Sequence, residues 1–214
     1  KARGVKKDSA RAVTLLEKGC SGGSMEGCTG LGVLHHRGSG VPRDVARASA
    51  LFQQACAGGH QTGCARLGAL YADGDGVPQD NARATALFQA ACDAKDPAGC
   101  VGLGRLYAAA IVPPPNDSSA AALFRDACEK RESSGCFQLG RLHESGTGAP
   151  QDFGRAASLY RQACEEGFGE ACYNLAGLYE KGAGVRRNPE QVVTFRRRAC
   201  QAGYAPACPV QKGA

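Results

Sequence analysis

Twelve cysteines with a strict spacing constrain this chain more than any other feature of its sequence. They form pairs eight residues apart, and each pair begins 36 residues after the one before it. The pairs are Cys20/Cys28, Cys56/Cys64, Cys92/Cys100, Cys128/Cys136, Cys164/Cys172 and Cys200/Cys208. A fixed period of this length is typical of a repeat solenoid, in which each unit packs only on its neighbours. We therefore expect a single solenoid over residues 1–214, with partial repeats at both ends.

One unit, residues 44–80, shows the pattern that the others repeat. Apolar residues recur at intervals of three and four from Val45 to Cys56, which predicts a helix with a single apolar face. Asp44 precedes this helix at the N-cap position, where a side-chain oxygen accepts from a free backbone N–H. The equivalent residues of the other units can also cap: Asp8, Asp80, Asn116, Asp152 and Asn188. The first helix of each unit is predicted to begin just after this residue.

A second helix is predicted from about Thr62 to Asp73, after a short turn rich in glycine. Gly68 lies on its apolar face, where the missing side chain lets a neighbouring helix come close. Gly74 and Gly76 follow the helix, at positions where a left-handed backbone is needed. Each unit is thus predicted to be a helical hairpin, and the fold class is predicted to be all-α.

The cysteine pair joins the two helices of each predicted hairpin. Cys56 lies near the end of the first helix and Cys64 in the first turn of the second, so the two lie side by side. Strict pairing of this kind argues for disulfide bonds and an oxidising compartment. In the chain-entropy model, a bridge over so short a loop contributes about 2.5 kcal/mol. Buried thiols that act as small apolar groups are one alternative. Zinc is another, although the pairs lack C-x-x-C spacing and matching histidines.

Charge and hydropathy give little sign of a nucleic acid or a membrane. The formal charge is +6, but Lys and Arg are interleaved with Asp and Glu along the chain, without the aromatic residues that stack on bases. No apolar run approaches the ~20 residues that span a bilayer, so we expect no transmembrane segment. The sequence opens at Lys1 within a loop-like segment and shows no signal peptide, and we expect the natural protein to extend upstream.

The stretch GCARLGALYADGDGVPQDNARATALFQAAC, residues 63–92, resembles a Sel1-like repeat, a relative of the tetratricopeptide repeat. The 36-residue period with a cysteine pair in each unit resembles the Helicobacter cysteine-rich protein group. This resemblance implies a right-handed αα superhelix with one disulfide in each repeat. It also implies a secreted or periplasmic protein. A mitochondrial assembly factor has a similar repeat, which makes the intermembrane space the alternative location.

The third unit departs from the pattern. It reads AAAIVPPPND after Tyr107, so that Ala110 and Val112 replace the two glycines and three prolines stiffen the connection. We interpret this segment as a loop that turns by another route, and a docking strip for a partner is the alternative. Pro209 follows Cys208 where a helix would continue, so the last unit is predicted to be a half-repeat.

The search for catalytic or metal-binding residues finds no arrangement, so we expect no catalytic residue, no cofactor and no metal. The four histidines lack metal-ligand spacing, and His35 and His143 replace the tyrosine of other units, which favours half-buried packing. Penicillin binding with weak β-lactamase activity has been attributed to the Helicobacter group. A serine enzyme of that class needs S-x-x-K, S-D-N and K-T-G elements, and the chain has none of them. This activity is therefore the alternative function, and an enzyme is not expected.

A binding scaffold is the function that the repeats favour, because stacked hairpins form a long concave surface. Positions that vary between units on that surface choose the ligand. The candidate contacts are Arg66, Arg105, Gln138, Arg141 and Asn174, with the series His35, Tyr71, Tyr107, His143 and Tyr179. Alternatively, the arginines lie on the solvent edge. We expect the partner to be a protein or an extended peptide, no nucleic acid, and the chain to be a monomer.

Basic residues are densest near the C-terminus. The concentration comprises Lys181, Arg186, Arg187, Arg196, Arg197 and Arg198. It has two interpretations, a site for an acidic partner and a solvated face, and the second is favoured because long charged side chains usually lie in solvent.

Overall fold

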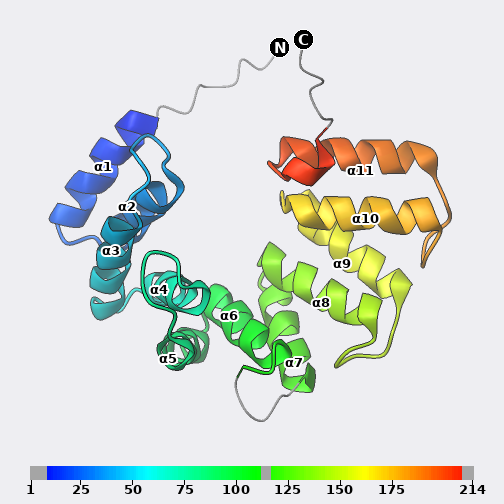
Figure 1. The fold of residues 1–214 in the computed structure, drawn as a ribbon, viewed down its shortest axis with the longest axis horizontal. Coiled ribbons are helices and arrows are strands. Elements are labelled where there is room, and N and C mark those ends of the chain that lie inside the picture. Colours follow the sequence, from blue (N-terminus) through cyan, green and yellow to red (C-terminus); the bar gives the residue numbers. More distant parts are fainter. Residues whose placement is uncertain (1–8, 112–116, 209–214) are drawn as a thin grey trace. The chain divides into compact units, whose positions relative to one another are not determined.

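The structure is a computed structural model that describes residues 9–111 and 117–208 (Figure 1). These residues form eleven α-helices and a 3₁₀ turn, without a strand among them. The helices are α1 (Ser9–Ser21), α2 (Met25–Arg37), α3 (Val45–Ala57), α4 (Gln61–Asp73), α5 (Asn81–Asp93), α6 (Pro97–Ala108), α7 (Asp117–Glu129), α8 (Ser133–Ser145), α9 (Phe153–Glu165), α10 (Gly169–Lys181) and α11 (Pro189–Gln201), followed by η1 (Ala205–Ala207). The predicted all-α class is confirmed.

Successive helices pair into the predicted hairpins, and several neighbouring hairpins pack on one another. Within hairpins, α1 packs on α2, α3 on α4, α7 on α8 and α9 on α10. Between hairpins, α2 packs on α3, α4 on α5, α8 on α9 and α10 on α11. The chain divides into two compact units, Lys1–Gly102 and Leu103–Ala214. A single continuous solenoid over the whole chain stays a prediction.

The helix boundaries follow the residues that the sequence indicated. The carboxylates of Asp44, Asp80 and Asp152 accept hydrogen bonds of 2.9 Å from the backbone N–H three residues on. Gly74 and Gly76 have φ of 67° and 70°, in the left-handed region that suits glycine. The residues Asp8 and Asn116, and the segment from Val112 through the three prolines, lie outside the described residues.

The third unit ends its second helix without glycine. Ala110 takes a φ of +54°, in the left-handed region that its glycine counterparts occupy. The backbone of this hairpin therefore keeps the turn while an alanine bears the strain.

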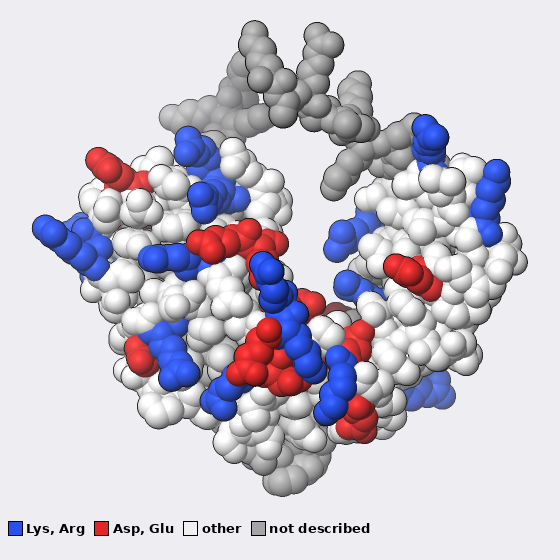
Figure 2. All heavy atoms as spheres, turned by 180° about the vertical axis from the view of Figure 1, so that it is seen from behind, with Lys and Arg blue, Asp and Glu red and all other residues white. Residues whose placement is uncertain are grey.

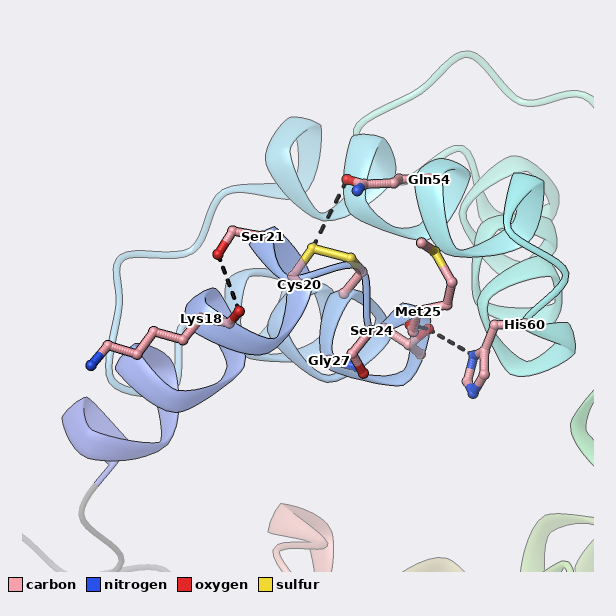
Figure 3. The surroundings of a disulfide bond; sticks show 10 residues. Lys18, Cys20, Ser21, Ser24, Met25, Gly27, Gln54 and His60 are labelled. Carbon is pink, nitrogen blue, oxygen red and sulfur yellow. Dashed lines mark hydrogen bonds between the residues drawn. A yellow bond between two sulfur atoms is a disulfide. The ribbon is translucent and has the colours of Figure 1, made fainter.

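All six cysteine pairs form disulfides, with Cα atoms 4.5–4.8 Å apart. In the first hairpin, the bridge of Cys20 joins the end of α1 to the first turn of α2 (Figure 3). Beside it, the Gly27 N–H donates to the Ser24 hydroxyl at 3.0 Å and so caps α2. The predicted pairing is confirmed, and bridges in this number belong to an oxidising environment outside the cytoplasm.

Eight cysteines are core residues as well as members of a bridge. Four of them are the most deeply buried. Each is the second cysteine of its pair and is at most 1% exposed: Cys28, Cys100, Cys136 and Cys172. These side chains lie in the first turn of a hairpin's second helix, where the hairpin core covers them. The alternative of buried free thiols predicted buried cysteines, and these four are buried. Their sulfur atoms are nevertheless bonded in disulfides and are not free thiols. They present no surface to a ligand, and their contribution is structural.

An aromatic ring fills the place of a missing side chain on the second helix of four hairpins. The glycine–ring pairs are Gly32/Phe52, Gly68/Phe88, Gly104/Phe124 and Gly140/Tyr160. In each pair the ring belongs to the first helix of the next hairpin, so the two helices pack closely where the glycine lies. Ala176 takes the glycine position in α10, and the equivalent ring position is the exposed Arg196. The predicted close approach at Gly68 is confirmed.

Candidate functional site

Three of the predicted ligand contacts, Arg66, His35 and Tyr71, belong to α2 and α4 of the first unit. Arg66 is exposed on α4 and His35 is half-buried on α2. The Tyr71 hydroxyl accepts a hydrogen bond of 3.3 Å from Arg83, whose guanidinium lies 5.5 Å from the centre of the ring. Part of the Tyr71 surface is therefore already occupied by a residue of the same chain.

Three predicted contacts come together in the second unit. Gln138 and Arg141 on α8 and Asn174 on α10 line a hollow of about 400 Å³. Glu144, Ser145 and Thr147 also line it, and Phe124 and Leu142 add apolar surface. Arg105 and Tyr107, on α6, are exposed and half-buried respectively. This hollow is the candidate functional site.

A buried tyrosine fixes the wall of the hollow. Tyr160 is fully buried, and its hydroxyl donates a hydrogen bond of 2.6 Å to Glu144 Oε2. The side chain of Asn174 hydrogen-bonds to the same hydroxyl. Burial raises the pKa of Tyr160 well above its usual value, and the hydrogen bond to Glu144 raises it further. The hydroxyl therefore stays a donor at neutral pH and holds residues of α8 and α10 in place.

Unused hydrogen-bonding groups remain around this fixed wall. Arg141 donates to the Gln138 side-chain oxygen at 3.4 Å. A guanidinium carries five N–H donors and an amide carries two, so most donors of both side chains are available to a ligand. Arg141 is exposed, while Gln138 and Asn174 are half-buried. The hollow thus offers both donors and acceptors next to apolar surface.

Packing explains part of the variation that the sequence pointed to. The residue two after the second cysteine faces the first helix of its own hairpin. A side chain on Gly30 would meet Leu16 at 2.9 Å, and one on Gly102 would collide with the ring of Phe88. Packing inside the hairpin therefore leaves room only for glycine at these two positions. At the same position of their own repeats, Gln138 and Asn174 line the hollow.

His143 is more buried than the half-buried packing role predicted for it. His143 is a buried residue of α8, and its Nδ1 lies 3.1 Å from the carbonyl oxygen of Pro150. The residue leaves little surface for a ligand. Tyr179 is half-buried, and its hydroxyl accepts a hydrogen bond of 2.6 Å from Arg161.

Sequence reasoning missed Glu144 and Tyr160. A signal was present: Tyr160 is the one tyrosine in the series Phe52, Phe88, Phe124 and Tyr160. A hydroxyl at a buried ring position needs a hydrogen-bond partner, so the substitution indicates a polar group nearby.

The described residues hold neither a metal-binding cluster nor a membrane-spanning helix. Across residues 9–111 and 117–208, no three His, Cys, Asp or Glu side chains gather in a way that could hold a metal ion. Over the same residues, none of the helices has the length and apolar character needed to cross a membrane.

Three solved structures show what this fold is similar to. A protective antigen of uropathogenic Escherichia coli, c5321, displays an SLR fold and is 27% identical over 96% of this chain, with a TM-score of 0.62. This chain spans 44% of the length of that antigen. A Sel1 repeat protein from Oxalobacter formigenes has a TM-score of 0.70 and 20% identity, over 92% of this chain and 84% of that one. The immunity protein Pa5087 from Pseudomonas aeruginosa has a TM-score of 0.67 and 19% identity, over 93% and 76%.

The family assignment comes from the sequence. A search of curated proteins finds no match. The family described as Sel1 repeat matches six consecutive segments: residues 2–24, 26–60, 62–96, 97–131, 133–168 and 169–204. Each of the last five segments covers the second helix of one disulfide-linked hairpin and the first helix of the next. The segments follow the repeat along the chain, so the predicted resemblance is confirmed. The chain belongs to the Sel1 repeat family and is a disulfide-bonded member of it.

Proposed function

We propose that this protein is a scaffold that binds a partner protein through an extended peptide segment. The binding site is the hollow lined by Gln138, Arg141 and Asn174. The observation that carries this proposal is the convergence of these three variable positions, from two successive hairpins, on one hollow of about 400 Å³.

The chemistry of the hollow suits a peptide backbone. An extended peptide presents N–H donors and C=O acceptors that its own structure leaves unpaired. The amides of Gln138 and Asn174 can donate and accept, and Arg141 donates, so together they match both backbone groups. Phe124 and Leu142 give apolar surface for a side chain of the peptide.

The disulfides support a role outside the cytoplasm. Disulfides form and persist in oxidising compartments, where each bridge holds a small hairpin together. We therefore expect secretion or export to the periplasm, with the mitochondrial intermembrane space as the alternative. Binding on the concave surface of a solenoid, and a monomeric chain, stay predictions. The penicillin-binding alternative gains no support from the family match or the structural comparisons.

Selection from a peptide library tests the proposal. Oxidised protein is the bait for phage that display random 12-residue peptides, and recovered peptides are titrated by calorimetry into the wild type and into Gln138→Ala/Arg141→Ala/Asn174→Ala. We expect the triple variant to bind at least about tenfold more weakly, because several hydrogen bonds, one of them to a charged group, are lost. Arg66→Ala is the control, since Arg66 is an exposed arginine of the other unit. Equal binding by the triple variant would refute the assignment of the site.

A further inference from the structure

A second and larger cavity lies in the second unit, where α9, α10 and α11 pack together. Its volume is about 1030 Å³, and its lining includes Arg161, Tyr179, Arg186, Arg187 and Phe195. In Figure 2, Lys and Arg side chains project from the edge of the molecule where α10 joins α11, at the left of the view. Arg186 and Arg187, which line the cavity, are exposed residues of the loop between α10 and α11.

The charges around this cavity are unbalanced. Three arginines line it, and Glu190 is the one acid among its lining residues. Arg161 donates to the Tyr179 hydroxyl. Arg186 and Arg187 are exposed and form no ion pair within the described part of the chain.

Nearby arginines of α11 are engaged elsewhere. Arg196 pairs with Glu180 at 2.8 Å, and the Arg198 guanidinium lies 5.8 Å from the centre of the Phe195 ring. Arg186 and Arg187 thus place two adjacent positive charges on the loop that lines the cavity.

The fold itself does not require these two arginines. The equivalent residues of other loops are Pro78 and Gln79, and Pro150 and Gln151. These loops share one backbone hydrogen bond. In each, the N–H of the residue that follows the two equivalent positions donates to the carbonyl oxygen nine residues earlier. Asp80 donates to Tyr71 at 2.9 Å, and Asn188 donates to Tyr179 at 3.2 Å.

The cap after the loop also loses a negative charge. Asn188 replaces the aspartate of the other described loops, yet its Oδ1 still accepts from the N–H groups of Glu190 and Gln191. Compared with Pro78, Gln79 and Asp80, the three residues 186–188 each carry one more positive charge. The backbone hydrogen bond of the loop is the same in both.

The first loop supplies an internal example of what such an arginine binds. Arg43 occupies the position of Arg187 and contacts both carboxylate oxygens of Asp75, at 2.7 and 2.8 Å. A two-pronged contact of this kind is the geometry by which arginine recognises a carboxylate. Arg187 carries the same group at the same position of its loop.

We propose that the cavity between α9, α10 and α11 binds an acidic peptide segment of a partner protein, with Arg186 and Arg187 holding its carboxylates. Tyr179 and Phe195 stack with ring centroids 5.7 Å apart and form an apolar wall for the peptide. A nucleic acid is disfavoured, since it needs cations spaced along its phosphates and the two loop arginines that line the cavity are adjacent residues. This site is separate from the hollow at Asn174 and stands even if that hollow binds nothing.

Fluorescence anisotropy tests this site with a defined probe. The probe is a fluorescein-labelled peptide with six consecutive glutamates and one tyrosine, and its glutamine counterpart is the uncharged comparison. The test variant is Arg186→Pro/Arg187→Gln, which gives the loop the residues of Pro78 and Gln79. Arg66→Gln/Arg125→Gln removes the same charge from two exposed arginines elsewhere.

We expect the wild type and the Arg66/Arg125 variant to bind the glutamate peptide with equal affinity. The loop variant should bind about tenfold more weakly or worse, because two charge-assisted contacts are lost. Arg187→Gln alone, a residue that Gln79 and Gln151 show to fit this loop, should give an intermediate loss and guards against misfolding of the double variant. Equal losses in both double variants, or no binding by the wild type, would overturn the proposal. Preferential binding of a single-stranded 12-mer oligonucleotide at the same loop would also overturn it.

Discussion

The ring of Phe52 occupies the space in which a side chain on Gly32 would begin. A Cβ atom built on Gly32 would lie 2.5 Å from Cε1 of the ring, closer than real carbon atoms approach. The same relationship recurs between α4 and α5 at Gly68 and Phe88. Each glycine therefore weakens its own helix and in return lets the next hairpin pack against it.

Gly32→Ala is expected to destabilise the protein although alanine favours helices. The new methyl group collides with Phe52, and overpacking of this kind costs about 1–3 kcal/mol. Gly177→Ala is the matched control, because nothing lies within 4 Å of its added Cβ in the middle of α10. That control should gain up to about 1 kcal/mol from helix propensity. Denaturant unfolding of both variants tests this pair, and equal stabilisation by the two would contradict the packing argument.

Tyr160→Phe should lower the free energy of unfolding by about 1–2 kcal/mol, because Glu144 and Asn174 lose the hydroxyl to which both are hydrogen-bonded. The ring itself is tolerated, since Phe occupies the same position in α3, α5 and α7. The pKa of Tyr160 is raised in the folded protein, so its contribution is present below the ordinary tyrosine pKa near 10 and is lost as pH rises above it. Urea midpoints from pH 8 to 10.5 should show the wild-type advantage shrinking only at the alkaline end. A difference between the wild type and Tyr160→Phe that stays constant across this pH range would contradict the raised pKa of Tyr160.

The carboxyl of Asp75 should titrate at a lower pH than an ordinary aspartate. Hydrogen bonds from Arg43, and then from His36, lower the pKa of Asp75. Its contribution to stability is therefore present above about pH 4 and is lost as pH falls through the lowered value. Carboxyl carbon shifts measured by NMR should give a higher midpoint in Arg43→Gln, a residue that Gln79 shows to fit the loop. Arg83→Gln is the control, and an unchanged midpoint in Arg43→Gln would contradict the assignment.

The disulfides predict a mass and a stability. Each bridge removes two hydrogens, so six bridges make the intact chain about 12 Da lighter than its reduced form. Removing one bridge with Cys128→Ala/Cys136→Ala should lower the free energy of unfolding by about 2.5 kcal/mol or more. Alanine is chosen over serine because a serine hydroxyl would be buried at the position of Cys136. Mass spectrometry after alkylation under denaturing, non-reducing conditions checks the first expectation, and unfolding curves check the second. Alkylated cysteines in the purified protein would disprove the pairing.

The sequence predicted most of the fold because the signals that define a hairpin are local and recur. The second helix was predicted from about Thr62 and begins at Gln61, and the caps and stops at Asp44 and Gly74 lie where the pattern indicated. The candidate site was only partly predictable. Glu144 and Tyr160 meet across two hairpins, and a repeat period aligns equivalent positions without saying which side chains of neighbouring units touch.

The burial of His143 was unpredictable for a related reason. Its Nδ1 reaches the carbonyl oxygen of Pro150, whose place depends on how the following loop folds back. Periodicity identified the position as one that packs, but it did not reveal the hydrogen bond that lets an imidazole be buried there.

Site-specific crosslinking is the most direct measurement of the proposed peptide site. A peptide selected from the library is synthesised with a benzophenone side chain, irradiated on the oxidised protein, and the crosslinked residues are identified by mass spectrometry. The account predicts crosslinks on the rim of the hollow, at Leu142, Ser145 or Thr147, and their loss in Gln138→Ala/Arg141→Ala/Asn174→Ala. Crosslinks on α3 and α4 around Arg66, or a pattern unchanged in the triple variant, would contradict it.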